Sequence, residues 1–345
     1  MKTLTVIVAL GAAAGLAPAA GGTAPRWQPQ TSGVTSRLRG VSAASDRVVW
    51  ASGASGTILR TADGGGTWQR LEVPDTNKLD FRDIDAVDER TAYALSIGAG
   101  PASRIFKTTD AGAHWTLQFT NDDPKAFYDA MAFWDASRGI AVSDSVEGTF
   151  VILATGDGGA HWTRIPADVL PAALPNEGAF AGSGTNIAVF GRDTAWIGTG
   201  ASTRSRVVRT TDGGRTWSIA DTPIVTSASA GIFSVAFRDP SHGLVAGGDY
   251  RKEKDATDVA AMTSDGGATW TLVKGLGGFR SVIAHLPGSR ASWIAVGPSG
   301  TDISLDDGRT WSPVEGDGYH AFSFAPQGGV GWGVGESGRI GKLIW

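Results

Sequence analysis

The chain has 345 residues, 41% of them hydrophobic, with no cysteine and a formal net charge of −4. A chain without cysteine has no disulfide, zinc thiolate site, iron–sulfur cluster or thiol nucleophile. Its acidic balance argues against nucleic acid as the main partner, because neutralising phosphates requires a basic surface. Glycine (49) and tryptophan (13) are frequent, which indicates tight turns and bulky packing residues rather than long helices.

Residues 1–20 have the pattern of a secretory signal peptide. A basic start at Lys2 is followed by an apolar stretch over residues 4–16 and by Ala-Pro-Ala at 17–19. The apolar stretch is too short for a transmembrane helix. We therefore expect cleavage near Ala19, a periplasmic or secreted protein without a membrane span, and one domain over residues 21–345. An apolar N-terminus without a targeting role is the alternative.

A motif of the form Ser/Thr-x-Asp-x-Gly-x-Thr/His-Trp then recurs six times, at intervals of 41 to 55 residues. Three β-rich runs precede each motif; in the first repeat they cover residues 38–43, 48–53 and 56–61. A period near 50 with strand-like patterning is typical of β-propeller blades of four strands. The motif aspartates are Asp63, Asp110, Asp157, Asp212, Asp265 and Asp306.

The two ends of the chain complete one another. Residues 319–345 repeat the first three runs of a blade without a motif, and residues 26–33 supply a fourth run, with Trp27 in the place of a motif tryptophan. A blade made from both ends closes the ring and removes two exposed sheet edges. The sequence therefore predicts an all-β, seven-bladed propeller with four-stranded blades, the last closed by both chain ends.

The motif residues suit a tight turn between the third and fourth strands of a blade. The carboxylate accepts backbone N–H groups, glycine supplies a positive φ, and tryptophan packs between blades. A calcium loop is the alternative, but one carboxylate per motif falls short of the six to eight oxygens that calcium takes. His114 and His161 replace threonine in two motifs and are expected to be turn residues. We predict structural motif aspartates, no metal site and no cofactor.

The phrase WASGASGTILRTADGGGTW at 50–68 resembles the photosystem II assembly and stability factor family, within the wider bacterial neuraminidase-repeat, or Asp-box, propellers. The resemblance covers residues 26–345. It is specific for the fold but not for the activity, because sialidases, xyloglucanases and non-enzymatic assembly factors share the motif. It implies a non-enzymatic protein that docks a polypeptide through an arginine patch.

Candidate ligand-binding residues lie where the innermost strands begin, on the face opposite the motif turns. An arginine or histidine follows a large apolar residue at four of these starts, and the arginine fork suits carboxylates and phosphates. We expect the four to converge at the channel mouth. The alternative is internal pairing of each arginine with a neighbouring carboxylate, such as Asp83 or Asp129. The four residues are Arg39, Arg82, Arg280 and His320.

Two long loops are predicted on the same face, over residues 166–184 and 248–259. Long loops at a propeller mouth commonly carry binding. Glu177, with Gly178 and Phe180 beside it, is expected to fold over the mouth. The charge run 251–255 favours a solvated insertion.

A glycoside hydrolase is the alternative function. A xyloglucanase-like enzyme needs two carboxylates across a cleft, although such enzymes pair two propellers. A sialidase-like enzyme needs three arginines and a tyrosine nucleophile, for which Tyr128 is available. Its Phe-Arg-Ile-Pro phrase is replaced here by Phe-Arg-Asp-Ile at 81–84, and those enzymes are six-bladed. The candidate carboxylates are Asp83, Asp129, Asp144 and Glu177.

The sequence thus favours an exported, monomeric, non-enzymatic propeller that binds a protein or peptide partner, or assists assembly of a complex, through its channel mouth. Binding or hydrolysis of a glycan is the alternative.

Overall fold

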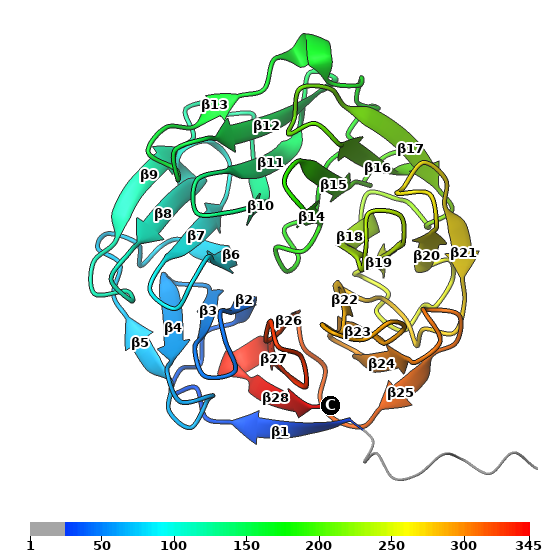
Figure 1. Cartoon of the computed structure of the whole chain (residues 1–345). Helices are drawn as coiled ribbons and strands as arrows, with labels where there is room; N and C mark the ends of the chain where they lie inside the picture. Colours follow the sequence, from blue (N-terminus) through cyan, green and yellow to red (C-terminus); the bar gives the residue numbers. More distant parts are fainter. Residues whose placement is uncertain (1–24) are drawn as a thin grey trace, which may run out of the picture.

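A computed structural model describes residues 25–345 as a ring of seven four-stranded antiparallel sheets (Figure 1). The predicted seven-bladed propeller is therefore confirmed. The predicted signal peptide lies outside the described residues. Helical structure within them consists of three short 3-10 turns, η1 (Gly100–Ala102), η2 (Ala167–Val169) and η3 (Glu336–Gly338).

Blades 1 to 3 each use four consecutive strands, numbered from the channel outward. Blade 1 contains β2 (Leu38–Ala43), β3 (Val49–Gly53), β4 (Thr57–Thr61) and β5 (Gln69–Leu71). Blade 2 contains β6 (Asp80–Ala86), β7 (Ala92–Ile97), β8 (Arg104–Thr108) and β9 (Thr116–Thr120). Blade 3 contains β10 (Tyr128–Phe133), β11 (Gly139–Val146), β12 (Thr149–Thr155) and β13 (Thr163–Arg164).

Blades 4 to 6 follow the same order. Blade 4 contains β14 (Ile187–Phe190), β15 (Thr194–Gly198), β16 (Ser205–Thr210) and β17 (Ser218–Thr222). Blade 5 contains β18 (Ala230–Phe237), β19 (Gly243–Asp249), β20 (Ala260–Thr263) and β21 (Thr271–Val273). Blade 6 contains β22 (Val282–His285), β23 (Trp293–Gly297), β24 (Gly300–Ser304) and β25 (Ser312–Val314).

Blade 7 joins strands from both ends of the described chain. It contains β26 (Ala321–Phe324), β27 (Val330–Val334), β28 (Ile340–Ile344) and, outermost, β1 (Arg26–Gln30). β1 runs antiparallel to β28, with Trp27 opposite Leu343, and the two strands lie side by side in Figure 1. The Trp27 ring packs on Tyr319, with ring centroids 4.3 Å apart. The predicted closure by both chain ends is confirmed.

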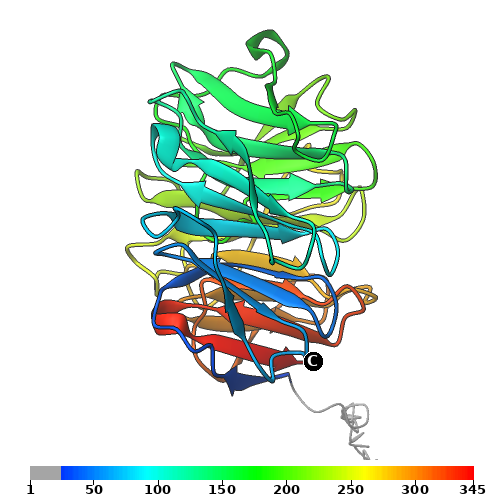
Figure 2. The ribbon, with the colours of Figure 1, turned by 90° about the vertical axis from the view of Figure 1, so that its left-hand side faces the viewer.

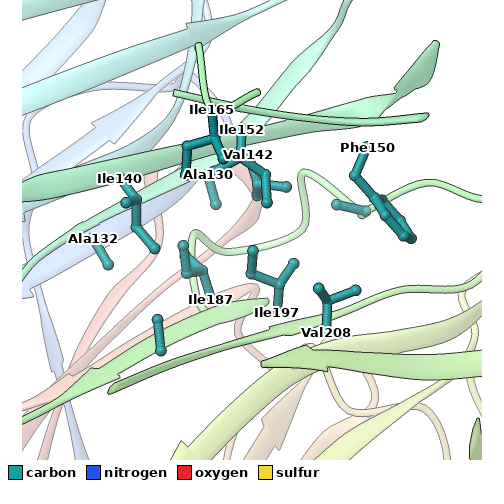
Figure 3. Close-up of a cluster of buried hydrophobic side chains, with 12 residues drawn as sticks. Ala130, Ala132, Ile140, Val142, Phe150, Ile152, Ile165, Ile187, Ile197 and Val208 are labelled. Carbon is teal, nitrogen blue, oxygen red and sulfur yellow. The ribbon is translucent and has the colours of Figure 1, made fainter. Parts of the chain in front are cut away.

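Apolar side chains between neighbouring blades hold the ring together. Figure 3 shows one such cluster, in which Ile140 and Val142 of blade 3 face Ile187 and Ile197 of blade 4. All four are at most 5% exposed. Burial of one such side chain stabilises the fold by about 1.5–3 kcal/mol, so the packing between blades is a major source of stability.

The six motifs form the turns between the third and fourth strands of blades 1 to 6, and we call the face that carries them the motif face. In blade 4, Asp212 accepts hydrogen bonds from the Thr216 N–H at 2.9 Å and the Thr216 hydroxyl at 2.6 Å. The Thr210 hydroxyl donates to the same carboxylate at 2.9 Å and accepts from the Gly214 N–H at 3.0 Å. In two turns a histidine Nδ1 takes the place of the second hydroxyl, His114 on Asp110 and His161 on Asp157. These contacts fit a turn-stabilising role.

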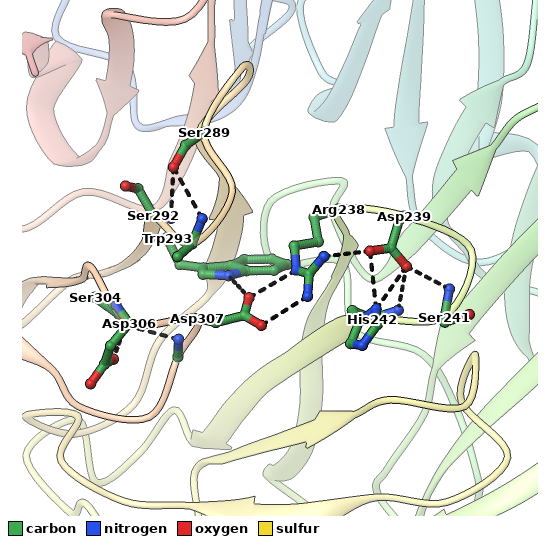
Figure 4. A network of polar contacts seen from close by, with 12 residues as sticks. Arg238, Asp239, Ser241, His242, Ser289, Ser292, Trp293, Ser304, Asp306 and Asp307 are labelled. Carbon is green, nitrogen blue, oxygen red and sulfur yellow. Dashed lines mark hydrogen bonds and ion pairs between the residues drawn. The ribbon is translucent and has the colours of Figure 1, made fainter.

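Polar contacts on the motif face also join neighbouring blades. Arg238, in the β18–β19 turn of blade 5, donates two hydrogen bonds of 2.9 Å to Asp307 in the motif of blade 6 (Figure 4). The Trp293 indole N–H donates to the same carboxylate at 3.0 Å. The opposite face, where the innermost strands begin, is here called the mouth face, and Figure 2 shows the strands running between the two faces.

Among residues 25–345, no helix reaches the length and apolarity needed to cross a bilayer.

Candidate functional site

Four innermost strands begin with a β-bulge at the mouth face. In blade 1 the pairing register shifts between Leu38 and Gly40, and equivalent shifts occur in blades 2, 3 and 5. A bulge leaves one residue out of the ladder and redirects its side chain. The preceding apolar residue can then enter the core while the bulged residue faces the mouth. The bulged residues are Arg39, Arg82, Asp129 and Phe233.

All four bulged residues line one cavity of about 730 Å³, which we call the mouth cavity. Basic side chains reach it from blades 1 and 2, carboxyl groups from blade 3, and aromatic rings mainly from blades 5 and 6. His320, Asp144 and Glu177 are also among its lining residues. The structure therefore brings together six of the nine sequence-predicted mouth residues.

Three arginines lie together on one side of the cavity, and two of them pair with the same carboxylate. Arg82 Nε lies 3.0 Å from Asp80 Oδ2, and an Arg37 guanidinium nitrogen lies 3.8 Å from the same atom. Among residues 25–345, Arg39 forms no ion pair, and its Nε lacks a hydrogen-bond partner. Burial, together with Arg82 and Arg37, lowers the pKa of Arg39 to about 10. The group therefore remains charged at neutral pH and attracts anions.

His320 lies beside this arginine cluster but carries no charge at neutral pH. Burial and the neighbouring Arg39 lower the pKa of His320 to about 4, although its Nε2 lies 2.7 Å from Glu336 Oε1. The imidazole therefore contributes a hydrogen-bonding group to the cavity wall, not a cation.

Arg280 does not join the cluster, and its expected convergence with Arg39 and Arg82 is wrong. Its side chain is 3% exposed and forms an ion pair of 2.7 Å with Asp302 of β24. It also donates to the Ser299 hydroxyl at 3.1 Å. A carboxylate on the same blade therefore draws the guanidinium below the surface. Likewise, the arginine partners are Asp80 and Asp302 rather than the expected Asp83 and Asp129.

Tyr128 and Asp83 also lie outside the mouth cavity. Tyr128 is 3% exposed and packs edge-on against Phe119, with ring centroids 5.3 Å apart. Asp83 accepts a hydrogen bond of 2.7 Å from the Met131 N–H, which joins blade 2 to blade 3. Its carboxyl group lines a second cavity of about 700 Å³ between the innermost strands. Because Tyr128 packs away from the arginines, the arrangement of a sialidase is not formed.

A segment of the chain, residues 178–186, separates the two cavities, and we call it the channel plug. Ala179 to Gly182 line the mouth cavity, whereas Ser183 to Thr185 line the second cavity. Arg82 of blade 2 donates to the Ala181 carbonyl at 3.1 Å. Ser183 donates to the Ser281 carbonyl beside blade 6 at 2.8 Å. Opposite sides of the ring therefore hold the plug, which forms the floor of the mouth cavity.

Glu177 fixes the start of the channel plug. Its carboxylate accepts hydrogen bonds from Arg206 Nε at 2.9 Å, the Thr199 hydroxyl at 2.6 Å and the Leu174 N–H at 2.8 Å. The side chain is fully buried. Glu177 thus borders the mouth, as expected, but its carboxylate is engaged by Arg206 in the interior.

Two carboxyl groups of blade 3 remain available in the cavity. Burial and the adjacent Asp144 raise the pKa of Asp129 well above its usual range. Burial raises the pKa of Asp144 to about 6. Backbone N–H groups of the plug, from Ala181 and Ala179, oppose these increases only in part. Of the four carboxylates suggested for a glycoside hydrolase, only this pair faces the mouth without an ion-pair partner among the described residues.

Aromatic rings form the opposite wall. Phe180 of the plug stacks on Phe233, with centroids 4.1 Å apart, and Phe279 meets Phe233 edge-on at 4.7 Å. Tyr250, which is 42% exposed, completes the group. The neighbouring charge run 251–255 is exposed, in agreement with a solvated insertion. Arg37 and Tyr250 were not singled out from the sequence; they lie in a linker and a loop, where no repeat marks a position.

The described residues include no group of three or more His, Asp or Glu side chains placed to hold a metal ion.

Comparisons with known proteins agree on the fold. No protein-family model matches the sequence, and no curated protein matches it. The chain is similar to the solved structure "YCF48 bound to D1 peptide", with TM-score 0.66 and 17% identity over 95% of this chain and 99% of that chain. YCF48 from Cyanidioschyzon merolae gives TM-score 0.64 and 17% identity over 92% and 99%.

A glycoside hydrolase shares the architecture as well. The GH74 xyloglucanase from Xanthomonas campestris gives TM-score 0.63 and 14% identity over 92% of this chain and 53% of that chain. The chain therefore spans about half of that enzyme. At these identities the likeness concerns the fold, and function has to be argued from the site.

Proposed function

We propose that this chain is a non-enzymatic propeller that binds a polypeptide segment in its mouth cavity and acts as an assembly or stability factor. The observation that carries the proposal is the cluster of Arg37, Arg39 and Arg82, in which Arg37 and Arg82 pair with Asp80 and Arg39 has no ion-pair partner among the described residues. The fold likeness to YCF48, one structure of which is described as bound to D1 peptide, supports it. Membership of the Asp-box propellers, and of the photosystem II assembly factor family in particular, is part of the proposal.

The cavity suits a segment that carries an acidic group and an apolar side chain that reaches the opposite wall. A carboxylate at Arg39 gains charge-assisted hydrogen bonds, which are about twice as strong as neutral ones. An apolar side chain of the same segment packs across the cavity against Phe233 and Tyr250, where aromatic rings offer a large contact area. Export, a mature domain over residues 21–345 and a monomeric state complete the proposal.

Direct binding tests this function. Short peptides with one acidic and one aromatic residue, labelled at one end, are titrated with the purified protein and followed by fluorescence anisotropy. We expect binding that weakens with salt, because exposed charges are screened, and that weakens at least tenfold in Arg39→Gln/Arg82→Gln. Arg192→Gln, an exposed arginine on the motif face, is the matched control. Equal affinity of the double variant and the wild type would overturn the proposal.

Glycoside hydrolysis is the second candidate function, because Asp129 and Asp144 both line the cavity and both have raised pKa values. A protonated and an ionised carboxyl group are the pair that acid–base hydrolysis of glycosides requires. Turnover of a panel of β-glucans that is lost in Asp144→Asn would favour this function, and binding of a glycan without turnover would favour a carbohydrate-binding propeller. If glycans are neither hydrolysed nor bound, peptide binding remains as the single candidate function.

A further inference from the structure

Asp129 and Asp144 form an acidic site that the neighbouring cations leave uncompensated. Asp129 is 2% exposed, and its Oδ2 has no hydrogen-bond partner. Among the residues that the structure describes, neither carboxyl group forms an ion pair, because Arg82 is held by Asp80 and the Ala181 carbonyl. Lys125 is another basic residue of the cavity, but its Nζ lies 2.6 Å from Glu147 Oε1 and is paired with that carboxylate instead.

The channel plug is shaped around this pair. A Cβ atom at Gly178 would overlap Oδ1 of Asp144, so a larger residue there would displace the carboxyl group from its present position. The N–H groups of Ala179 and Ala181 turn toward Asp144 and Asp129 respectively. The plug therefore lies close against both carboxyl groups, although their mutual repulsion and burial disfavour the ionised forms.

A cation in the cavity would offset the free energy that burial and mutual repulsion add to ionising these two carboxyl groups. Asp144 is partly exposed, whereas Asp129 lies buried beside it on the adjacent strand. A positive group that reaches Asp144 from the mouth would therefore face two carboxyl groups, the second shielded from water, where charge attraction is strongest. An ammonium or guanidinium group also offers the hydrogen-bond donors that Asp129 Oδ2 lacks.

We propose that Asp144, backed by Asp129, binds an ammonium or guanidinium group of the same polypeptide segment whose acidic group binds at Arg39. This inference rests on the proposed function and narrows it. The preferred segment carries a basic side chain as well as an acidic one, and a purely acidic segment uses only part of the site.

The test compares two peptides that differ at one position, lysine against its neutral analogue norleucine, both with the same acidic and aromatic residues. The position is scanned along the peptide. For the wild type we expect the lysine peptide at the best position to bind at least tenfold more tightly than the norleucine peptide. In Asp144→Asn we expect this preference to vanish while the affinity for the norleucine peptide is retained. Asp122→Asn, which changes an exposed carboxylate in the loop between β9 and β10, should keep the preference.

The outcomes separate the two proposals. If both peptides bind and Asp144→Asn keeps the lysine preference, the acidic site is overturned and the peptide-binding function stands. If no peptide binds, the peptide-binding function fails, and argininamide then probes the acidic site by itself through the carboxyl carbon resonances in NMR titration. A saturable shift that is lost in Asp144→Asn supports the site, and an absent or unchanged shift overturns it.

Discussion

The two faces of the ring use repetition differently. On the motif face, one position carries aspartate in six blades, and each carboxylate serves the same turn. On the mouth face, the bulged position carries Arg39, Arg82, Asp129 or Phe233 in blades of the same geometry. The motif turn requires a carboxylate as hydrogen-bond acceptor, and aspartate therefore occupies this position in all six motifs. The bulge forms with different side chains, so the residue at the bulged position can differ between blades and contact a ligand.

The same difference appears in the protonation of the carboxyl groups. Hydrogen bonds from Thr216 lower the pKa of Asp212 to about 2, whereas burial raises the pKa of Asp85, on an innermost strand, to about 6. Turn carboxylates are therefore stabilised in the charged form, and the carboxyl groups near the channel are stabilised in the neutral form.

The largest expected effect on stability comes from substituting Glu177. This residue lies at the mouth but has a structural role, so it is an exception to the contrast between the two faces. Glu177→Gln leaves the Arg206 guanidinium buried without its counter-charge, which costs about 3–5 kcal/mol of unfolding free energy. Urea denaturation measures it. The double variant Glu177→Gln/Arg206→Met should recover part of the loss, and a single variant as stable as the wild type would show that the ion pair does not hold the plug.

The pH dependence sharpens the contrast between the two kinds of carboxyl group. Asp85 binds its proton more tightly in the folded state, so its contribution to stability is complete below pH 4 and is lost as the pH rises from about 4 to about 6. Asp212 behaves oppositely: its contribution is present above pH 4 and is lost as the pH falls toward about 2. Asp85→Asn should gain about 1–3 kcal/mol relative to the wild type between pH 4 and pH 6. Thermal unfolding of both proteins across this pH range is the measurement. A stability difference between variant and wild type that does not change with pH would contradict the assignment.

Arg39→Gln tests the mouth face directly. We expect a loss of about 1.4 kcal/mol in the binding of an acidic peptide, a tenfold weaker affinity. The melting temperature should stay the same or rise slightly, because the substitution relieves repulsion from Arg37 and Arg82. Calorimetric titration and a melting curve measure the two effects. A variant that melts earlier and binds normally would place Arg39 among the structural residues.

Asp212→Ala should show the reverse behaviour with the smallest effect. The partly exposed turn loses its hydrogen bonds to Thr216 and Thr210, which we expect to lower stability by about 1 kcal/mol. Peptide binding, measured well below the melting temperature, should be unchanged. Loss of binding in a folded variant would mean that the motif face takes part in recognition.

The repeat made the fold predictable, because six copies of one turn fix the blade length and Trp27 identifies the missing strand. The mouth was predictable only in part. Repeat alignment located the positions of Arg39, Arg82 and His320 in the cavity wall, but not the partner that Arg280 finds in Asp302 on another strand. Asp83 could not pair with Arg82 in its own strand, since adjacent strand residues point to opposite sides. Asp129 lines the same cavity as Arg82, but that guanidinium is held by Asp80 and the Ala181 carbonyl.

The closure of blade 7 has a consequence for how the ring forms. β1 is the first strand in chain order and its partner β28 is the last. The Trp27–Leu343 pair therefore joins residues from opposite ends of the described chain. Contacts between distant residues form slowly, because the intervening chain has to be ordered first. Until then the outer edge of β28 and the apolar surface around Tyr319 lack their cover, and such edges invite association with other chains. We therefore expect ring closure to be the slow step of folding and the interval in which the protein is most prone to aggregate.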